Sequence, residues 1–250
     1  NTRGWGGYAR LEQDLSFANL VITGALHDER ITYQNDIDKT PQTYFHFREE
    51  DVVDNMRSAE IQLFPKEDSR IKWQAGLYYL DHKFYFPNPA AISGDSFGGV
   101  TVLASDGGRS KSYAVYGQAT IPLPDRLGLT LGGRFNRDEL DAYGKVDIAS
   151  GGVIIVPGET ARDSTSFQKF TWRAALDYKP TDGLLVYASA SRGFKAGVYN
   201  LITFSGEPID PETIDAFELG MKSELFDRRL RLNLAGFYYD YRNPQVQTQQ

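Results

Sequence analysis

The side chains that most often carry out chemistry are sparse in this sequence and form no catalytic pattern. Cysteine is absent, which excludes a thiolate zinc site and a cysteine nucleophile. The histidines His27, His46 and His82 lie far apart, and no two of them have the spacing of metal ligands. No Gly-x-Ser-x-Gly turn, phosphate loop or dinucleotide-binding motif occurs. We therefore expect no catalytic residues and no bound metal or cofactor, and the chemistry that remains is binding.

The first candidate binding site is a cluster of aromatic and charged side chains within a long polar segment. It consists of Tyr44, His46 and Arg48, which offer stacking, hydrogen-bonding and cationic groups close together. Contact with a ligand and packing within the segment itself explain such a cluster about equally well. The carboxylates that follow it are interpreted as a solvated, like-charged loop rather than as a cation site; they are Glu49, Glu50, Asp51 and Asp54.

The other candidates lie where apolar runs meet polar segments. Tyr85 belongs to the aromatic run Phe84-Tyr85-Phe86-Pro87. Aromatic rings at the end of an apolar run are typical of residues at a membrane interface, which is the favoured interpretation. Contact with a ligand is the second interpretation. Arg192 and Lys195 would attract an anionic ligand or line a water-filled interior, and the interior is favoured.

Composition points to a protein rich in strands. The 250 residues carry 27 Lys and Arg against 33 Asp and Glu, so the net charge is −6 and nucleic acid is a poor partner. The 24 glycines, 15 tyrosines and 15 phenylalanines favour strands joined by turns. No uncharged stretch approaches the roughly 18 apolar residues of a membrane helix. A membrane β-barrel stays possible, because its alternating residues keep the mean hydropathy low, here −0.43.

Apolar and polar residues alternate along the whole chain, which is the pattern of β-strands. It is clearest in Phe170–Tyr178, where every second residue is apolar, and it recurs in Ile71–Tyr79, Leu127–Phe135 and Leu230–Tyr238. The alternation predicts about ten strands, and the weaker ones are Tyr8–Asp14, Leu20–Asp28, Arg57–Phe64, Ser112–Ile121, Leu184–Ser191 and Thr213–Leu225.

The last of the weaker strands has a competing reading. Asp210 and Pro211 would cap and begin a helix, and the apolar residues after them fit helical spacing as well as alternation. Gly220 and the regular order of hairpins favour a strand.

Short and long connections alternate between the predicted strands. Tight turns fall at 15–18, 65–69, 122–126, 180–183 and 226–228, and all but the first contain Pro, Asp or Gly. Long connections fall at 29–56, 83–111, 140–166 and 195–212. Outer-membrane barrels have short periplasmic turns and longer extracellular loops. Many of the predicted strands match the roughly 9 to 11 residues of a tilted membrane strand.

We therefore predict an all-β fold, an antiparallel transmembrane β-barrel section of about ten long strands with short periplasmic turns and long extracellular loops. In this arrangement Leu232 faces lipid and Asn233 faces the lumen.

Five runs in chain order carry a resemblance to a known family. They are Trp73–Tyr79, Leu131–Phe135, Ser191–Gly197, Phe217–Gly220 and Leu232–Tyr241. Together they resemble strands and hairpins of the barrels of TonB-dependent outer-membrane receptors, and the resemblance covers nearly the whole chain.

The resemblance implies a fold and a function. Such receptors have a barrel of about 22 strands closed by an N-terminal plug. They import scarce nutrients such as ferric siderophores, haem, cobalamin or glycans with energy from the inner-membrane TonB complex. Residues 1–250 would then be part of one barrel domain in the bacterial outer membrane, without plug or TonB box. Its partners would be outer-membrane lipid, a ferric siderophore or similar nutrient complex, and the TonB complex through the absent plug.

Counting strands from the first tight turn places both chain ends on the extracellular side, whereas receptors of this family have both ends in the periplasm. We therefore expect a section of a longer barrel, with its first and last strands unpaired at their outer edges. Two other function classes stay open, namely a passive outer-membrane barrel and a soluble all-β carbohydrate-binding module.

Overall fold

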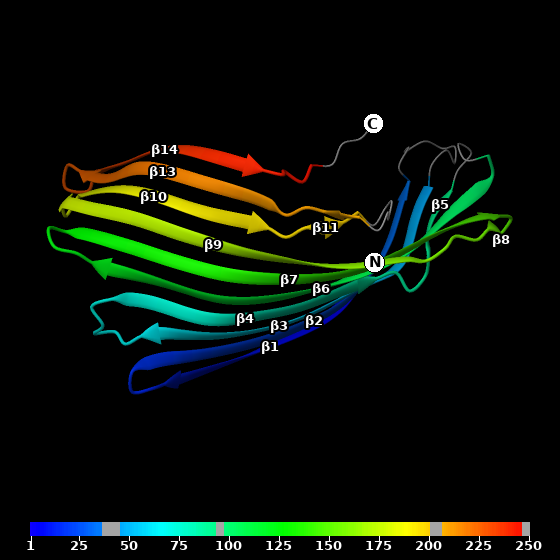
Figure 1. Cartoon of the computed structure of the whole chain (residues 1–250), viewed down its shortest axis with the longest axis horizontal. Helices are drawn as coiled ribbons and strands as arrows, with labels where there is room; N and C mark the ends of the chain where they lie inside the picture. Colours follow the sequence, from blue (N-terminus) through cyan, green and yellow to red (C-terminus); the bar gives the residue numbers. More distant parts are fainter. Residues whose placement is uncertain (37–45, 94–97, 201–206, 247–250) are drawn as a thin grey trace.

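The computed structural model describes residues 1–36, 46–93, 98–200 and 207–246, with the backbone alone at 33–36, 46–51 and 90. Ten long strands form one antiparallel sheet in which each strand pairs with its neighbours along the chain (Figure 1). These strands are β1 (Thr2–Asp14), β2 (Ala18–Asp36), β3 (His46–Pro65), β4 (Lys72–Tyr85), β6 (Val100–Pro122), β7 (Leu127–Ser150), β9 (Ala161–Thr181), β10 (Leu184–Lys195), β13 (Glu212–Leu225) and β14 (Leu230–Arg242).

Four short strands lie at the end of the sheet opposite the tight turns, which we call the loop end. There β5 (Ala90–Ser93) pairs with β3 and β6, and β8 (Val153–Val156) pairs with β7. A separate two-stranded ribbon joins β11 (Val198–Tyr199) to β12 (Pro208–Ile209). The described residues contain no helix of the length and apolarity needed to cross a membrane.

All ten predicted strands are present, including the ambiguous one, which is β13. The tight turns are also confirmed, and in the first of them the Leu15 N–H donates to the Ala18 carbonyl at 2.9 Å. The long connections predicted at 29–56, 83–111 and 140–166 are shorter than expected, because most of the described residues in them continue the strands. β7 has 24 residues, more than twice the roughly 9 to 11 that cross a membrane. In the outer part of β7 the backbone pairing continues, but apolar and polar residues no longer alternate, because both faces of the sheet meet water.

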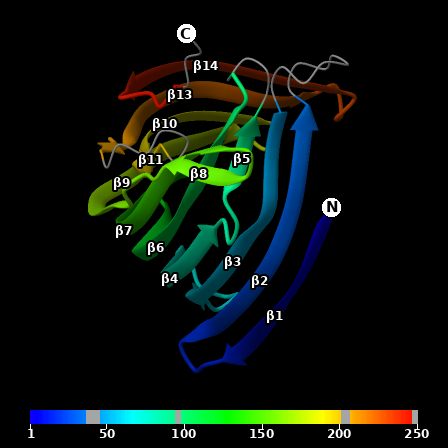
Figure 2. The same cartoon turned by 90° about the vertical axis from the view of Figure 1, so that its right-hand side faces the viewer.

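The sheet is curved along its width into a trough, with β1 and β14 at its two edges (Figure 2). Side chains of adjacent residues point to opposite faces, and paired residues share a face. On the convex face, large apolar side chains are openly exposed. Examples are Leu77 at 55%, Phe170 at 58% and Leu219 at 63%.

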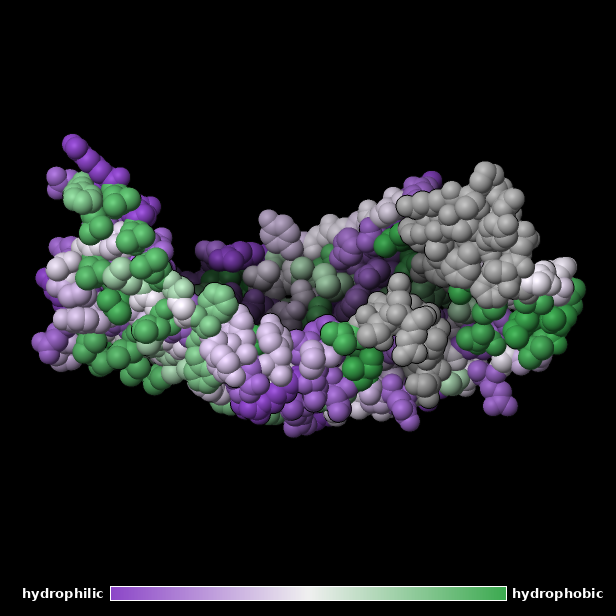
Figure 3. Space-filling view, turned by 90° about the horizontal axis from the view of Figure 1, so that it is seen from above, coloured by the Kyte–Doolittle hydropathy of each residue, from purple (hydrophilic) through white to green (hydrophobic). Residues whose placement is uncertain are grey.

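The described residues form no conventional core. Among the described residues no large side chain is fully buried, and the buried apolar ones are small: Ala18, Val21, Val53, Ala114, Ala142 and Ala149. Seen from above, hydrophobic side chains cover the wall near the tight turns, a polar stretch follows toward the loop end, and the hollow of the trough lies behind (Figure 3). Apolar residues outside and polar residues inside are the arrangement of a membrane barrel.

Candidate functional site

The concave face carries a polar hollow of about 500 Å³ across the middle of the sheet. Its polar side chains come from six strands, β3, β4, β6, β7, β9 and β10, because every second residue of each strand points inward. They are Glu60, Gln62, Gln74, Tyr116, Gln118, Arg134, Thr171, Arg173 and Ser191. We call this surface the concave hollow.

Tyr116 organises the centre of the concave hollow. Its hydroxyl donates to the Glu60 carboxylate at 2.6 Å and accepts from the Gln62 side-chain amide at 3.0 Å. The Arg134 guanidinium lies 5.3 Å from the centre of the Tyr116 ring and 5.3 Å from that of Tyr78. These contacts tie together groups from four strands, so the polar groups are held in place before any ligand arrives.

A glycine makes room for this tyrosine. Gly76 pairs with Tyr116 on the neighbouring strand. A Cβ atom at Gly76 would lie 2.5 Å from the ring and 2.9 Å from the Ile61 carbonyl oxygen. The ring therefore lies across a position that no larger residue could occupy without displacing it.

The same arrangement recurs on β10 and β13. Tyr187 pairs with Gly220, where a Cβ atom would again lie 2.5 Å from the ring. The Tyr187 hydroxyl donates to Glu218, and the Lys222 ammonium lies 5.6 Å from the ring centre. The concave face thus presents two fixed tyrosine–glutamate pairs, each with a cation above a ring, and such groups bind polar ligands or peptide by hydrogen bonds.

A histidine–carboxylate pair lies further toward the loop end. The His82 Nε2 atom is 3.0 Å and 3.1 Å from the two oxygens of Asp54. The register places Ser110 opposite His82, but among the described residues no serine hydroxyl hydrogen-bonds a histidine. The described residues also hold no group of three His, Asp or Glu side chains suited to a metal ion.

At the loop end, connecting segments are tied back to the long strands. The Tyr199 hydroxyl of β11 donates to Asp163 of β9 at 2.7 Å, and burial together with this carboxylate raises the pKa of Tyr199. Asp147 of β7 pairs with Lys145 at 2.8 Å and accepts from the Gly158 N–H at 2.8 Å. Both contacts lower the pKa of Asp147. These ties shape the rim around the mouth of the trough.

Of the first predicted cluster, Tyr44 lies outside the described residues. His46 and Arg48 belong to β3 rather than to a loop, and their backbones pair with β2 on one side and β5 on the other. Their side chains lie outside what the structure describes. The ligand contact predicted for these three residues stays a prediction.

The other predicted residues do not come together. Tyr85 ends β4 on the convex face, where the Lys83 ammonium lies 4.7 Å from its ring centre. Lys195 ends β10, and the alternation from Tyr187 places it on the concave side. Arg192 lies on the convex face, and β6, β7 and β9 separate it from Tyr85.

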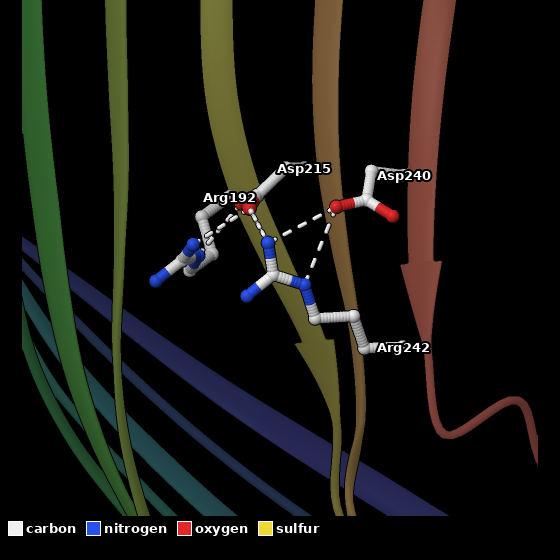
Figure 4. Close-up of polar contacts among 4 residues, drawn as sticks. All are labelled: Arg192, Asp215, Asp240 and Arg242. Atoms are coloured by element: carbon white, nitrogen blue, oxygen red, sulfur yellow. Dashed lines mark hydrogen bonds and ion pairs between the residues drawn. The ribbon is translucent and has the colours of Figure 1, made fainter.

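Arg192 makes a two-bond contact with Asp215, 2.6 Å for each bond, on the outside of the sheet (Figure 4). The Arg242 guanidinium joins them, 3.7 Å from Asp215 and 3.0 Å from Asp240. Asp215 shares its face with Phe217 and Leu219, because these residues are two and four positions further along β13. The interpretation of Arg192 as lining a wet interior was therefore wrong.

Sequence reasoning missed the concave hollow as a site. The signal was present in the polar members of the alternating strands, such as Gln74, Arg134 and Arg173. In the sequence these residues indicate strands, and they form a binding surface only when the strands lie side by side.

Comparison with known proteins gave concordant results. The family model described as TonB dependent receptor-like, beta-barrel matches residues 1–250. A curated relative, a probable TonB-dependent siderophore receptor, PiuA, from Acinetobacter baumannii, is 31% identical over 96 residues. That match covers 35% of this chain and 13% of the relative.

Two solved structures share the fold. The ferric yersiniabactin uptake receptor FyuA from Yersinia pestis has a TM-score of 0.81 at 18% identity, covering 99% of this chain and 37% of that one. The ferric-catecholate import receptor Fiu from Escherichia coli K12 has a TM-score of 0.67 at 15% identity, covering 96% and 41%. The chain thus spans well under half the length of these proteins.

Proposed function

Because the chain belongs to the TonB dependent receptor-like β-barrel family, we propose that it forms part of an outer-membrane receptor that imports a ferric siderophore with energy from the TonB complex. The observation that carries the proposal is the family match along all 250 residues. The names of the similar proteins favour a ferric siderophore over haem, cobalamin or a glycan, since they include a siderophore receptor and two receptors for ferric chelates.

In this proposal the convex apolar face meets the lipid of the bacterial outer membrane and the concave hollow faces the interior of the barrel. The whole of residues 1–250 belongs to one barrel domain. The edge strands β1 and β14 are not paired with each other, and in this proposal each pairs with a further strand of the receptor. Support comes from the physics of lipid, where unpaired backbone N–H and C=O groups cost several kcal/mol each.

The ligand first meets residues at the loop end and then passes the concave hollow. We assign the first contact to Tyr44, His46 and Arg48, with Lys195 on the concave side as a further cation. Tyr85 and Arg192 point away from the trough, so they would contribute at the outer rim alone. The TonB complex would act through a plug region of the receptor, for which the tied polar groups of the concave hollow offer hydrogen-bonding partners.

Uptake of radioactive iron tests the proposal. A strain that lacks the gene would be given ferric catecholate, hydroxamate and mixed-ligand siderophores under iron limitation. We expect uptake of at least one class to be lost, to return with the gene, and to require a functional TonB complex. Unchanged uptake of every chelate, or uptake that persists without TonB, would overturn the proposal.

Replacing Tyr44, His46 and Arg48 together by alanine tests the first contact. Uptake should weaken while the amount of barrel in the membrane, measured by its heat-dependent shift in electrophoresis, stays unchanged. Unaltered uptake would mean that the cluster serves loop packing.

A further inference from the structure

A second hollow lies on the convex face, just beyond the apolar band. The band ends at the aromatic pair Tyr79 and Tyr113, whose ring centres are 5.2 Å apart. Beyond this pair, toward the loop end, a hollow of about 400 Å³ opens between β4, β6, β7 and β9. By the alternation of these strands, its convex side chains are Lys83, Arg109, Asp141, Tyr143, Arg162 and Ser164. We call it the convex cationic hollow.

Two of its cations rest on aromatic rings. The Lys83 ammonium lies 4.7 Å from the ring centre of Tyr85, and the Arg162 guanidinium lies 5.3 Å from that of Tyr143. Gly107 lies between the two tyrosines, where a Cβ atom would come within 2.8 Å of each. Neither Lys83 nor Arg162 has an ion-pair partner among the described residues, so both charges are available to an anion.

The third cation, Arg109, is fixed in direction. It forms a two-bond pair with Asp81 at 2.7 Å and 2.5 Å. This pair, with help from Lys111, lowers the pKa of Asp81. The register also places Arg57 and Lys111 beside Asp81, so its negative charge is already matched.

The carboxylates leave a positive excess in the hollow. Asp141 is the one carboxylate of its lining on the convex side. Asp163 also borders it, but its side chain lies on the other face and accepts from Tyr199 at 2.7 Å. With Arg109 paired to Asp81, the two cations Lys83 and Arg162 face one carboxylate, Asp141, and this positive excess stands out in a chain of net charge −6.

We propose that the convex cationic hollow binds a phosphate group of a lipid in the outer leaflet. This inference rests on the proposed function, because the membrane position sets which lipid groups reach the hollow. Aromatic belts lie at the level of lipid headgroups, and the hollow lies directly beyond one. Guanidinium and ammonium groups bind phosphate by charge-assisted hydrogen bonds. The apolar residues next to it on the same face would hold the acyl chains, which favours a lipid over free phosphate.

Binding of diphosphoryl lipid A to the detergent-solubilised protein, expressed in full from its own gene, tests this proposal. The double variant Lys83→Ala with Arg162→Ala should bind roughly thirtyfold more weakly at low salt, because each cation at an anionic surface contributes about fivefold. Lys83→Arg with Arg162→Lys keeps both charges and should bind nearly as well as the original. Lys179→Ala with Arg126→Ala removes the same charge at the tight turns and should have no effect.

Two results would overturn the inference. One is equal lipid A binding by the Lys83→Ala, Arg162→Ala variant that still shows the heat-dependent shift of a folded barrel. The other is displacement of lipid A by millimolar inorganic phosphate, which would indicate a site for free anions. Iron uptake by the same variants distinguishes this inference from the proposed function. In a variant that loses lipid A binding but keeps iron uptake, the change concerns the convex cationic hollow alone.

Discussion

The concave and convex faces of this sheet are built from the same strands and differ in almost every physical respect. In β9, Phe170 and Leu176 are 58% and 45% exposed on the convex face, whereas Thr171 and Arg173 between them line the concave hollow. A soluble protein would bury the first pair. Large apolar side chains are exposed in the same way on the convex faces of the other strands. This pattern is that of a fold arranged between an apolar and an aqueous solvent rather than around a core.

The two faces also differ in how side chains are held. On the concave face polar groups are tied across strands, as Tyr116 is to Glu60 and Gln62. Along the apolar band of the convex face large side chains project outward, and charged pairs such as Arg192 and Asp215 appear beyond it. The inner face therefore gains its shape from hydrogen bonds, and in the proposed receptor the outer face would gain stability from lipid.

The largest expected effect comes from placing a charge on the apolar band. Leu234 is 56% exposed on the convex face of β14. Leu234→Arg should lower the free energy of unfolding by about 2–4 kcal/mol if the residue lies near the bilayer midplane. Refolding of the protein into lipid vesicles at increasing denaturant concentration measures this loss.

The adjacent residue is the matched control. Asn233 borders a polar hollow on the concave side. Asn233→Arg should therefore cost much less than Leu234→Arg. Equal losses at both positions would show that the two faces do not meet different solvents.

A smaller effect is expected from filling the space beneath a concave tyrosine. Gly76→Val would force the Tyr116 ring and the neighbouring backbone apart, at a cost of about 1–3 kcal/mol. Gly117→Val is the control, because the nearest atom to its Cβ position is 3.6 Å away, on the convex side. Similar melting temperatures of the two variants would argue against the packing of Tyr116 over Gly76.

The smallest effect is expected at the convex ion pairs. The Arg192 side chain is 38% exposed, so water screens its pairing with Asp215. A double-mutant cycle with Arg192→Ala and Asp215→Ala should give a coupling energy of about 0.2–1 kcal/mol. A coupling well above this range would mean that the pair lies within the low dielectric of the membrane.

The sequence predicts the strands, the tight turns and the phase of the alternation, because these follow from neighbouring residues. It does so even for β13, where helical spacing competes. It does not predict the full length of β6 and β7, since backbone pairing continues where both faces are polar. The face of Arg192 is also obscured, because Ala188, Ser189 and Ala190 before it are small and give no contrast between the two sides.

Contacts that depend on register lie beyond sequence reasoning altogether. Tyr116 and Glu60 are 56 positions apart, and they meet because β4 brings β3 and β6 to either side of it. The sequence therefore predicts the polar residues of the concave hollow but not that they form one surface.

A cysteine scan along β9 tests the assignment of the two faces most directly. The 250 residues contain no cysteine, so a cysteine introduced at one position from 170 to 177 is the single labelling site among them. Labels at Phe170, Trp172, Ala174 and Leu176 should be quenched by a lipid-soluble quencher and should resist water-soluble maleimide. Labels at Thr171, Arg173, Ala175 and Asp177 should behave in the opposite way. A uniform response, or alternation in the reverse phase, would contradict the assignment of the convex face to lipid.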